Sequence, residues 1–211
     1  MHAAYKPFTD GIILIGDLKI DIENFLNYHH EYETFEHTIS VAKKAAQIAH
    51  LFCIDPELAA QAGLLHDVSN VIPVNMMMSI AKNVSVEILE EEFSFHRIIH
   101  QKLSRSMANH VFGCANIAVL NAIECHTTLK AGASQLAKVL FVADKISWVL
   151  PGEHPYQEKM REHIQLLDLN GAVLVYLDHV WEQRNQMKLV HPWLIEAREE
   201  LLAAKRGNNR G

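Results

Sequence analysis

Four histidines and two aspartates recur at helix-length intervals along this chain of 211 residues. Each lies within or at the end of a segment whose apolar residues repeat with the period of an amphipathic helix. Each also lies on or beside the apolar stripe, where a polar side chain needs a partner that satisfies it. Such imidazole and carboxylate groups, carried by several helices, indicate a shared metal centre in a helical core. The six residues are His37, His66, Asp67, His100, His126 and Asp144.

Taken singly, each of these residues also fits a purely structural role. Asp144 follows the largely apolar run 136–143, and a carboxylate there either binds a metal or pairs with a lysine or arginine from elsewhere. His66 and Asp67 end a helix and can present two ligands together, but a histidine at a helix C-terminus is also favoured by the helix dipole. A single histidine on an apolar helix face is more often a hydrogen-bonded core residue than a ligand. The metal interpretation therefore depends on the whole set.

The elements that must position these side chains are all predicted to be helices. Asp55 and Pro56 are typical of a helix start, Ser85 and Ser134 are candidate N-caps, and Gly113 is a candidate helix end. We find no alternating strands, no fixed repeat and no linker rich in glycine, proline or serine, so we expect one all-α domain. The expected helices span residues 21–30, 35–52, 56–67, 73–78, 85–93, 95–112, 116–126, 134–148, 156–168, 171–188 and 193–204.

The two ends of the chain are less regular in sequence. Residues 1–20 are predicted to be an N-terminal extension, within which the apolar stretch 11–16 is either a short strand between glycines or a segment docked on the core. Residues 21–204 form the predicted domain. The polar tail 205–211 is expected to be frayed.

Composition excludes several classes of protein. A net charge of −6 without a basic stripe argues against a nucleic-acid partner. No apolar run is long enough to cross a membrane, and the N-terminus lacks the pattern of a signal peptide, so no membrane partner is expected. Three cysteines without a CxxC pair indicate a reducing compartment. We therefore expect a cytoplasmic protein.

The order of the ligand-type residues resembles that of the HD-domain superfamily of metal-dependent phosphohydrolases, in which His…His-Asp…Asp lie on helices. The positions of His100 and His126 resemble those of YqeK-type HD proteins, which are symmetrical diadenosine tetraphosphate hydrolases with a dinuclear iron centre. The resemblance covers about residues 21–204. Further matching motifs are Phe112-Gly113, His126-Thr127-Thr128, Phe141-Val142-Ala143-Asp144, His191-Pro192 and Glu196-Ala197-Arg198.

This resemblance implies a single HD-domain helical bundle with a dinuclear metal site in its core. One metal would be held by His37, His66, Asp67 and Asp144. Asp67 would bridge to a second metal held by His100 and His126, with His66 and Asp67 as the catalytic residues. Iron is the expected metal, with manganese or zinc as alternatives. A metal-activated water would attack the tetraphosphate bridge of the nucleotide and release two nucleoside diphosphates.

Three departures from the family pattern concern the substrate. Many HD phosphohydrolases have a phosphate-contacting lysine three residues after the aspartate, where this chain has Asn70. Gln101 replaces the usual glycine after the fourth ligand, and Leu129-Lys130 replaces Gly-Arg after the His-Thr-Thr motif. Lys130 can still offer phosphate a point charge, although without the fork of an arginine. The predicted phosphate contacts are Thr127, Thr128, Lys130 and Arg105.

Two other functions stay open at this point. The same ligand set resembles that of HD-type mixed-valent dinuclear iron oxygenases, and the missing lysine at Asn70 is compatible with that interpretation. The other alternative is a non-catalytic HD module that senses a nucleotide. The presence of all six ligand residues argues against this alternative. The resemblance further implies a homodimer.

Overall fold

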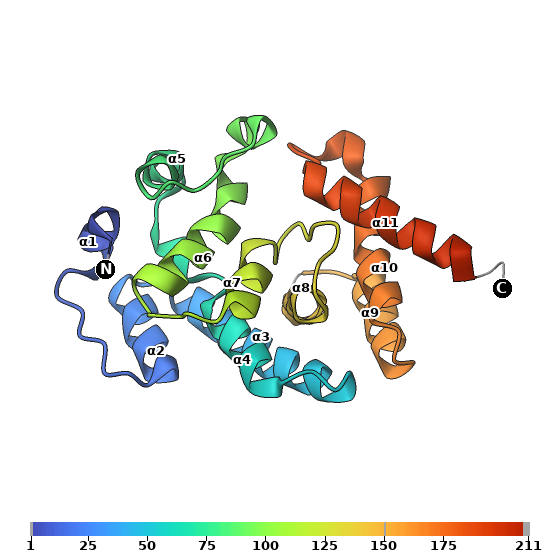
Figure 1. Ribbon diagram of the computed structural model, residues 1–211, viewed down its shortest axis with the longest axis horizontal. Helices are drawn as coiled ribbons and strands as arrows, with labels where there is room; N and C mark the ends of the chain where they lie inside the picture. Colours follow the sequence, from blue (N-terminus) through green and yellow to red (C-terminus); the bar gives the residue numbers. More distant parts are fainter. Residues whose placement is uncertain (1, 150, 209–211) are drawn as a thin grey trace.

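The computed structural model describes residues 2–149 and 151–208, and every regular element within these residues is a helix (Figure 1). This confirms the predicted all-α class. The α-helices are α1 (Lys6–Thr9), α2 (Leu18–Tyr28), α3 (Tyr32–Leu51), α4 (Pro56–Leu65), α5 (Val74–Asn83), α6 (His100–His110), α7 (Ile117–Glu124), α8 (Gln135–Ser147), α9 (Pro155–Gln165), α10 (Leu169–Glu182) and α11 (Pro192–Asn208). Short 3-10 helices are η1 (Ala3–Tyr5), η2 (Val68–Val71), η3 (Glu90–Ser94), η4 (His96–Ile99) and η5 (Arg184–Gln186).

Side-chain caps set the start of the helices around the centre of the molecule. The carboxylate of Asp55 accepts hydrogen bonds from the first turn of α4, which has Pro56 at its first position. Asn116 caps α7 and Ser134 caps α8 in the same way. At the end of α6, Gly113 adopts a φ of +68°, a conformation that a side chain would strain.

The core is built around the close packing of α3 on α4, with α8 lying against both. Ala45 and Ile48 of α3, Leu65 of α4 and Leu140 of α8 are almost completely buried. Gly63 makes the close approach of α3 and α4 possible, because a Cβ atom at this position would lie 2.6 Å from the Cα of Ala42. The interface that carries the predicted ligands is therefore also closely packed.

The C-terminal helices α9, α10 and α11 form a separate group on one side of α8, while α1 and α2 lie at the opposite end of the molecule (Figure 1). Helix α8 contacts both α9 and α10 through one face and α3, α4 and α7 through others. Because it is surrounded in this way, its residues from Val139 to Ile146 are all buried.

The prediction of a helix over residues 85–93 was wrong. Ser85 does not cap a helix, because its backbone has a φ of +56°, and the helical residues begin only at Glu90 as the 3-10 turn η3. Glu92 accounts for the difference. Its side chain turns inward, is fully buried and accepts a hydrogen bond from the backbone N–H of Leu89 at 2.7 Å. A regular helix would leave this acidic segment on the surface.

The two ends of the predicted domain also differ from expectation. Helix α2 begins at Leu18 rather than residue 21, because Asp17 caps it and Asp21 instead accepts hydrogen bonds from the N–H groups of Ile15 and Gly16. The stretch 11–16 forms no strand, and its apolar residues alternate between packing against the core and pointing outward. In the predicted tail, residues 205–208 continue α11, and residues 209–211 lie outside the described part.

Candidate metal centre

The six predicted ligands converge from five separate segments. His37 comes from α3, His66 and Asp67 follow α4, His100 opens α6, His126 follows α7 and Asp144 lies in α8. Their nitrogen and oxygen atoms form three overlapping groups, and within each group the ligand atoms lie within 4.8 Å of one another. These groups are His37, His66 and Asp67, then His66, His126 and Asp144, then Asp67, His100 and His126. Residues as far apart in sequence as His37 and Asp144 thus meet in one cluster.

Asp67 occupies the middle of this cluster. One of its carboxylate oxygens lies 3.3 Å from the Nε2 of His100 and 3.4 Å from the Nε2 of His126. Its other oxygen lies 3.6 Å from the Nε2 of His66. The two oxygens therefore face different histidines, which is the arrangement that a bridging carboxylate requires. An oxygen of Asp144 lies 3.7 Å from the same Nε2 atom of His66.

Backbone carbonyls fix the orientation of three histidine rings. The Nδ1 of His66 contacts the carbonyl of Gly63 at 2.6 Å, and His100 and His126 make the same contact with the carbonyl three residues earlier, at 2.8 Å and 2.9 Å. A carbonyl oxygen only accepts, so each Nδ1 carries the proton and donates it. The Nε2 of each neutral ring then presents a lone pair to the cluster, the form in which histidine binds metals.

The free cluster is poorly satisfied by its own atoms. The Nε2 atoms of His100 and His126 lie 3.2 Å apart, so two lone pairs face each other unless a cation or a proton lies between them. The Nε2 of His66 and one oxygen of Asp67 are buried without any hydrogen-bond partner among the described residues. Buried polar atoms are rarely left in this state. The donor set and these orphaned atoms fit a pair of metal ions.

Electrostatics keeps the cluster in the protonation states that metals need. Burial alone would raise the pKa of the Asp67 carboxyl, but the imidazoles of His66, His100 and His126 lower it well below its ordinary value, an effect that in the metal-free cluster requires a proton on an Nε2 atom facing the carboxylate. Burial likewise opposes ionisation of Asp144, and Lys145 and His37 outweigh it and lower the pKa. Burial lowers the pKa of His126 to about 4, so this ring is neutral at pH 7.

Comparison with known proteins assigns the chain to a family. The sequence model of the HD domain matches residues 34–149, a region that includes all six predicted ligands. The chain belongs to the HD domain family. The matched region begins just before His37 and ends just after Asp144, so it spans all of the predicted metal ligands. The HD domain is a metal-binding phosphohydrolase domain, and this protein is an HD-domain phosphohydrolase.

Individual relatives support the same assignment. An uncharacterized protein in the pepC 5′ region of Lactococcus lactis subsp. cremoris is 38% identical over 148 residues, 70% of this chain and 74% of that protein. The symmetrical bis(5′-nucleosyl)-tetraphosphatase of Halalkalibacterium halodurans is 29% identical over 143 residues, 66% of this chain and 73% of its own length. The resemblance to YqeK-type HD proteins is thereby confirmed.

A solved structure shares the fold. The crystal structure of a protein described as a predicted HD superfamily hydrolase involved in NAD metabolism, from Clostridium acetobutylicum, matches with a TM-score of 0.80 and 28% identity. The match covers 92% of this chain and 100% of the Clostridium chain. Among the described helices, none is long and apolar enough to cross a membrane. The homodimer and the cytoplasmic location stay predictions.

Lys145 is a part of the HD centre that the sequence did not reveal. Its ammonium group is completely buried and donates to one carboxylate oxygen of Asp144 at 2.6 Å and to the backbone carbonyl of His126 at 3.0 Å. The expected cation partner for Asp144 is thus its neighbour in sequence rather than a residue from elsewhere. A lysine is rarely fully buried unless it is paired with an opposite charge. The position of Lys145 in so apolar a helix was therefore the signal in the sequence that this lysine has a buried partner.

Gln101 has a structural role where the family usually has glycine. Its side chain is fully buried, and its carbonyl oxygen accepts hydrogen bonds from the backbone N–H groups of Thr127 at 3.1 Å and Thr128 at 3.3 Å. Its amide group also contacts the hydroxyl of Thr128 at 3.2 Å. Gln101 therefore fixes the turn that immediately follows His126.

The predicted phosphate contacts have different surroundings. The hydroxyl of Thr127 lies 3.2 Å from the Nε2 of His100, at the centre itself. Thr128 is buried and its hydroxyl faces Gln101. Lys130 and Arg105 both pair with Glu124, at 2.8 Å and 3.6 Å. The structure therefore brings Thr127 to the predicted metal ligands, whereas Lys130 and Arg105 meet at Glu124.

A hollow of about 760 Å³ lies beside His37. Glu33 and Glu36 line it together with Ser40, Ser147 and Trp148, and none of the described residues lining it is a lysine or an arginine. The protein thus offers a phosphate chain no side-chain cation in the described lining of this hollow. Positive charge for a phosphate there would have to come from bound metal ions, which reverse the local sign of the potential.

Proposed function

We propose that this HD domain hydrolyses diadenosine tetraphosphate symmetrically to two molecules of ADP. The observation that carries the proposal is the central position of Asp67, whose two oxygens face His66 on one side and His100 and His126 on the other. Two metals bridged by one carboxylate suit the cleavage of a phosphoanhydride. The tetraphosphatase of Halalkalibacterium halodurans, which covers 66% of this chain, supports the choice of substrate.

The proposed reaction consumes one water. Its oxygen forms a bond to a central phosphorus atom of the tetraphosphate, the bond from that phosphorus to the middle bridging oxygen breaks, and the two protons of the water pass to the product phosphates or to solvent as two ADP molecules leave. Two bound metals would lower the pKa of this water and neutralise charge on the attacking and leaving oxygens. No serine or cysteine nucleophile is needed.

The chain's own residues would hold the two metals and order the site. His37, His66 and Asp144 would bind the first metal, His100 and His126 the second, and Asp67 both. The mixed nitrogen and oxygen ligands suit iron, with manganese or zinc as alternatives. Asp67 and His66 would act in catalysis as ligands, because they would fix the two metals that hold and activate the attacking water.

The surroundings of the centre refine the proposed phosphate contacts. Thr127 is the best placed, because its hydroxyl already lies 3.2 Å from the Nε2 of His100. Lys130 and Arg105 would have to leave Glu124 before they could bind phosphate. We therefore propose that the metals and Thr127 bind the reacting phosphates.

The test is product analysis by anion exchange, with metal content measured on the same sample. Diadenosine tetraphosphate should give ADP as the sole product, and a His66→Ala variant should bind less metal and lose the activity. A matched control is His50→Ala, because His50 is exposed on α3 and should leave both properties unchanged. Intact substrate despite about two metals per chain contradicts the proposal, and oxygen consumption with a reduced iron centre would then test the oxygenase alternative.

A further inference from the structure

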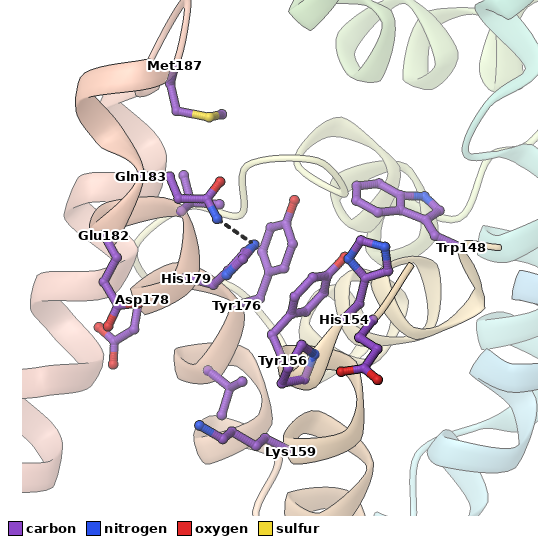
Figure 2. A pocket seen from close by; sticks show the side chains of 14 residues that line it. Trp148, His154, Tyr156, Lys159, Tyr176, Asp178, His179, Glu182, Gln183 and Met187 are labelled. Atoms are coloured by element: carbon purple, nitrogen blue, oxygen red, sulfur yellow. Dashed lines mark hydrogen bonds between the residues drawn. The ribbon is translucent and has the colours of Figure 1, made fainter. Parts of the chain in front are cut away.

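A second hollow, of about 790 Å³, lies between the end of α8 and the helices α9 and α10. Five aromatic or imidazole rings line it (Figure 2). In that view they follow one another along the cavity, from the end of α8 through α9 to α10, and several present a face or edge to the open space. These rings belong to Trp148, His154, Tyr156, Tyr176 and His179.

Mutual contacts hold these rings in place. Tyr156 stacks on His179 with ring centres 4.3 Å apart, and Tyr176 meets Tyr156 edge to face at 5.5 Å. Trp148 meets Tyr176 at 6.1 Å in the same manner. Tyr156 is buried, whereas the rings of Trp148, Tyr176 and His179 are only partly buried and keep exposed area toward the hollow. A rigid set of partly exposed rings is a stacking surface rather than only a core.

This hollow adjoins the metal centre through Trp148 and Lys145. Trp148 lines both the aromatic hollow and the hollow beside His37. The ammonium group of Lys145 lies 4.8 Å from the centre of the Trp148 ring and 5.4 Å from that of Tyr176, and 2.6 Å from the carboxylate of Asp144. One buried side chain thus contacts both the aromatic rings and a predicted metal ligand, which places the aromatic hollow next to the metal centre.

We propose that the aromatic hollow binds the nucleobase of the nucleotide whose phosphates lie at the metal centre. The inference rests on the proposed function for the identity of the phosphates, and names the part of the site that recognises the nucleoside. Base–aromatic stacking tolerates every base because each has a π face, and purines offer the larger one. Polar groups at the rim can meet the edge of the base, among them Lys159 and the amide of Gln183, which contacts His179 at 3.4 Å.

The aromatic hollow also explains how the protein could bind a nucleotide although no lysine or arginine is among the described residues that line the hollow beside His37. The described lining of that hollow includes Glu33 and Glu36 instead, so charge attraction for the phosphates would come from bound metals. Stacking in the aromatic hollow adds affinity that does not depend on charge. It would distinguish a nucleotide from inorganic phosphates, which the metals alone would bind equally well.

The test compares ADP with inorganic pyrophosphate by calorimetry on the metal-loaded protein. In His179→Ala and His154→Ala, whose rings line the aromatic hollow and not the hollow beside His37, the dissociation constant for ADP should rise about 5- to 150-fold, the range expected for loss of one base–aromatic stack. The dissociation constant for pyrophosphate and the metal content should stay within about twofold, the margin that we allow for indirect effects. His163→Ala is the matched control, because His163 lies on α9 outside the hollow and pairs with Asp168.

The possible outcomes distinguish failure of the proposed nucleobase subsite from failure of the proposed function. Unchanged ADP binding in both variants, equal weakening for ADP and pyrophosphate, or no ADP binding by the unaltered protein overturns the subsite. If diadenosine tetraphosphate is cleaved and its KM is unchanged in both variants, the subsite fails and the function stands. If ADP binding falls selectively but the unaltered protein does not cleave the tetraphosphate, the subsite stands and the proposed substrate fails.

Discussion

The ammonium group of Lys145 lies 2.6 Å from one carboxylate oxygen of Asp144, while the other oxygen of Asp144 lies 2.9 Å from the Nε2 of His37. One oxygen is thus held by a buried cation and the other faces the predicted metal ligands. The same ammonium group donates to the carbonyl of His126. Lys145 therefore connects a ligand of the first proposed metal site to the backbone of a ligand of the second.

Replacing Lys145 by methionine should weaken metal binding. Methionine preserves much of the side-chain volume but leaves an oxygen of Asp144 and the carbonyl of His126 without their donor. Removal of a residue that orients metal ligands typically lowers metal affinity about 10- to 100-fold. The measurement is metal content after equilibration with a chelator-buffered metal solution.

Lys138→Met is the control for this variant, because Lys138 lies on the same helix but bonds to Asn170 at the surface. It should retain the metal affinity of the unaltered protein. Equal metal affinity in the Lys145 and Lys138 variants would show that Lys145 does not position the ligands.

Replacing Gln101 by leucine should destabilise the fold through the turn after His126. Leucine fills the space but leaves the N–H groups of Thr127 and Thr128 without their acceptor. Each buried N–H left unsatisfied costs about 1–3 kcal/mol. Urea denaturation of the metal-free protein should detect this loss. Gln47→Leu, at an exposed site on α3, is the control and should change the free energy of unfolding little. A similar loss of stability in both variants would show that Gln101 does not stabilise the turn after His126.

Replacing Gly63 by alanine should separate α3 from α4. The new Cβ atom would lie 2.6 Å from the Cα and 2.8 Å from the backbone nitrogen of Ala42, so backbone rather than a flexible side chain must move. Overpacking of this kind costs about 1–3 kcal/mol. Because Gly63 also supplies the carbonyl that orients His66, metal affinity should fall as well.

Thermal unfolding and metal content together check the Gly63 variant. Gly207→Ala is the control, because nothing lies within 4 Å of a Cβ atom built there on helix α11. The control should be neutral or slightly more stable, since alanine favours helix by up to about 1 kcal/mol over glycine. A neutral Gly63→Ala variant would show that the two helices adjust freely.

The sequence predicted the parts of this protein that depend on local pattern. Helix periodicity located most of the helices, and caps such as Asp55 and Ser134 located their first turns. The six predicted ligands could be selected from the sequence because a polar group on an apolar helix stripe is costly to bury, so each of these residues was expected to point inward. Their convergence from distant segments is a consequence of packing those stripes together.

The sequence could not reveal contacts between side chains that are neighbours on one helix, or contacts that depend on irregular backbone. Lys145 directly follows Asp144, and neighbouring side chains on a helix point about 100° apart. The two side chains pair only because the long lysine side chain bends toward the carboxylate inside the core. The aromatic hollow combines Trp148 with rings from α9 and α10, which no local motif connects. Glu92 lies in the segment predicted as a helix over residues 85–93, and its inward turn depends on partners that are distant in sequence.

Those partners of Glu92 join the C-terminal helix to the rest of the domain. One oxygen of Glu92 accepts from the ammonium group of Lys102 at 2.8 Å, and the other lies 3.1 Å from the Nε2 of His191. The N–H of Trp193 donates to the Nδ1 of His191, so the proton of a neutral ring lies on Nε2 and points to Glu92. The His-Pro motif before α11 is thus attached to η3 and α6.

The buried carboxylate of Glu92 should make stability depend on pH. Burial opposes its ionisation, but the hydrogen bonds from His191, Lys102 and Leu89 outweigh this and lower its pKa below the ordinary 4.5. Ionised Glu92 therefore stabilises the fold at pH values above about 4.5, and this contribution is lost as the pH falls through the lower folded-state pKa. At pH 7, Glu92→Gln should cost about 3–5 kcal/mol, because it leaves Lys102 as an unpaired buried charge.

Urea denaturation at pH 7 and at pH 3 measures this contribution. The difference in unfolding free energy between the unaltered protein and Glu92→Gln should shrink at the lower pH, because protonation then removes the same charge as the substitution. Glu91→Gln, at an exposed neighbouring position, should show no difference from the unaltered protein at pH 7. A gap for Glu92→Gln that stays equal at both pH values would mean that packing of the side chain, rather than its charge, attaches α11 to the domain.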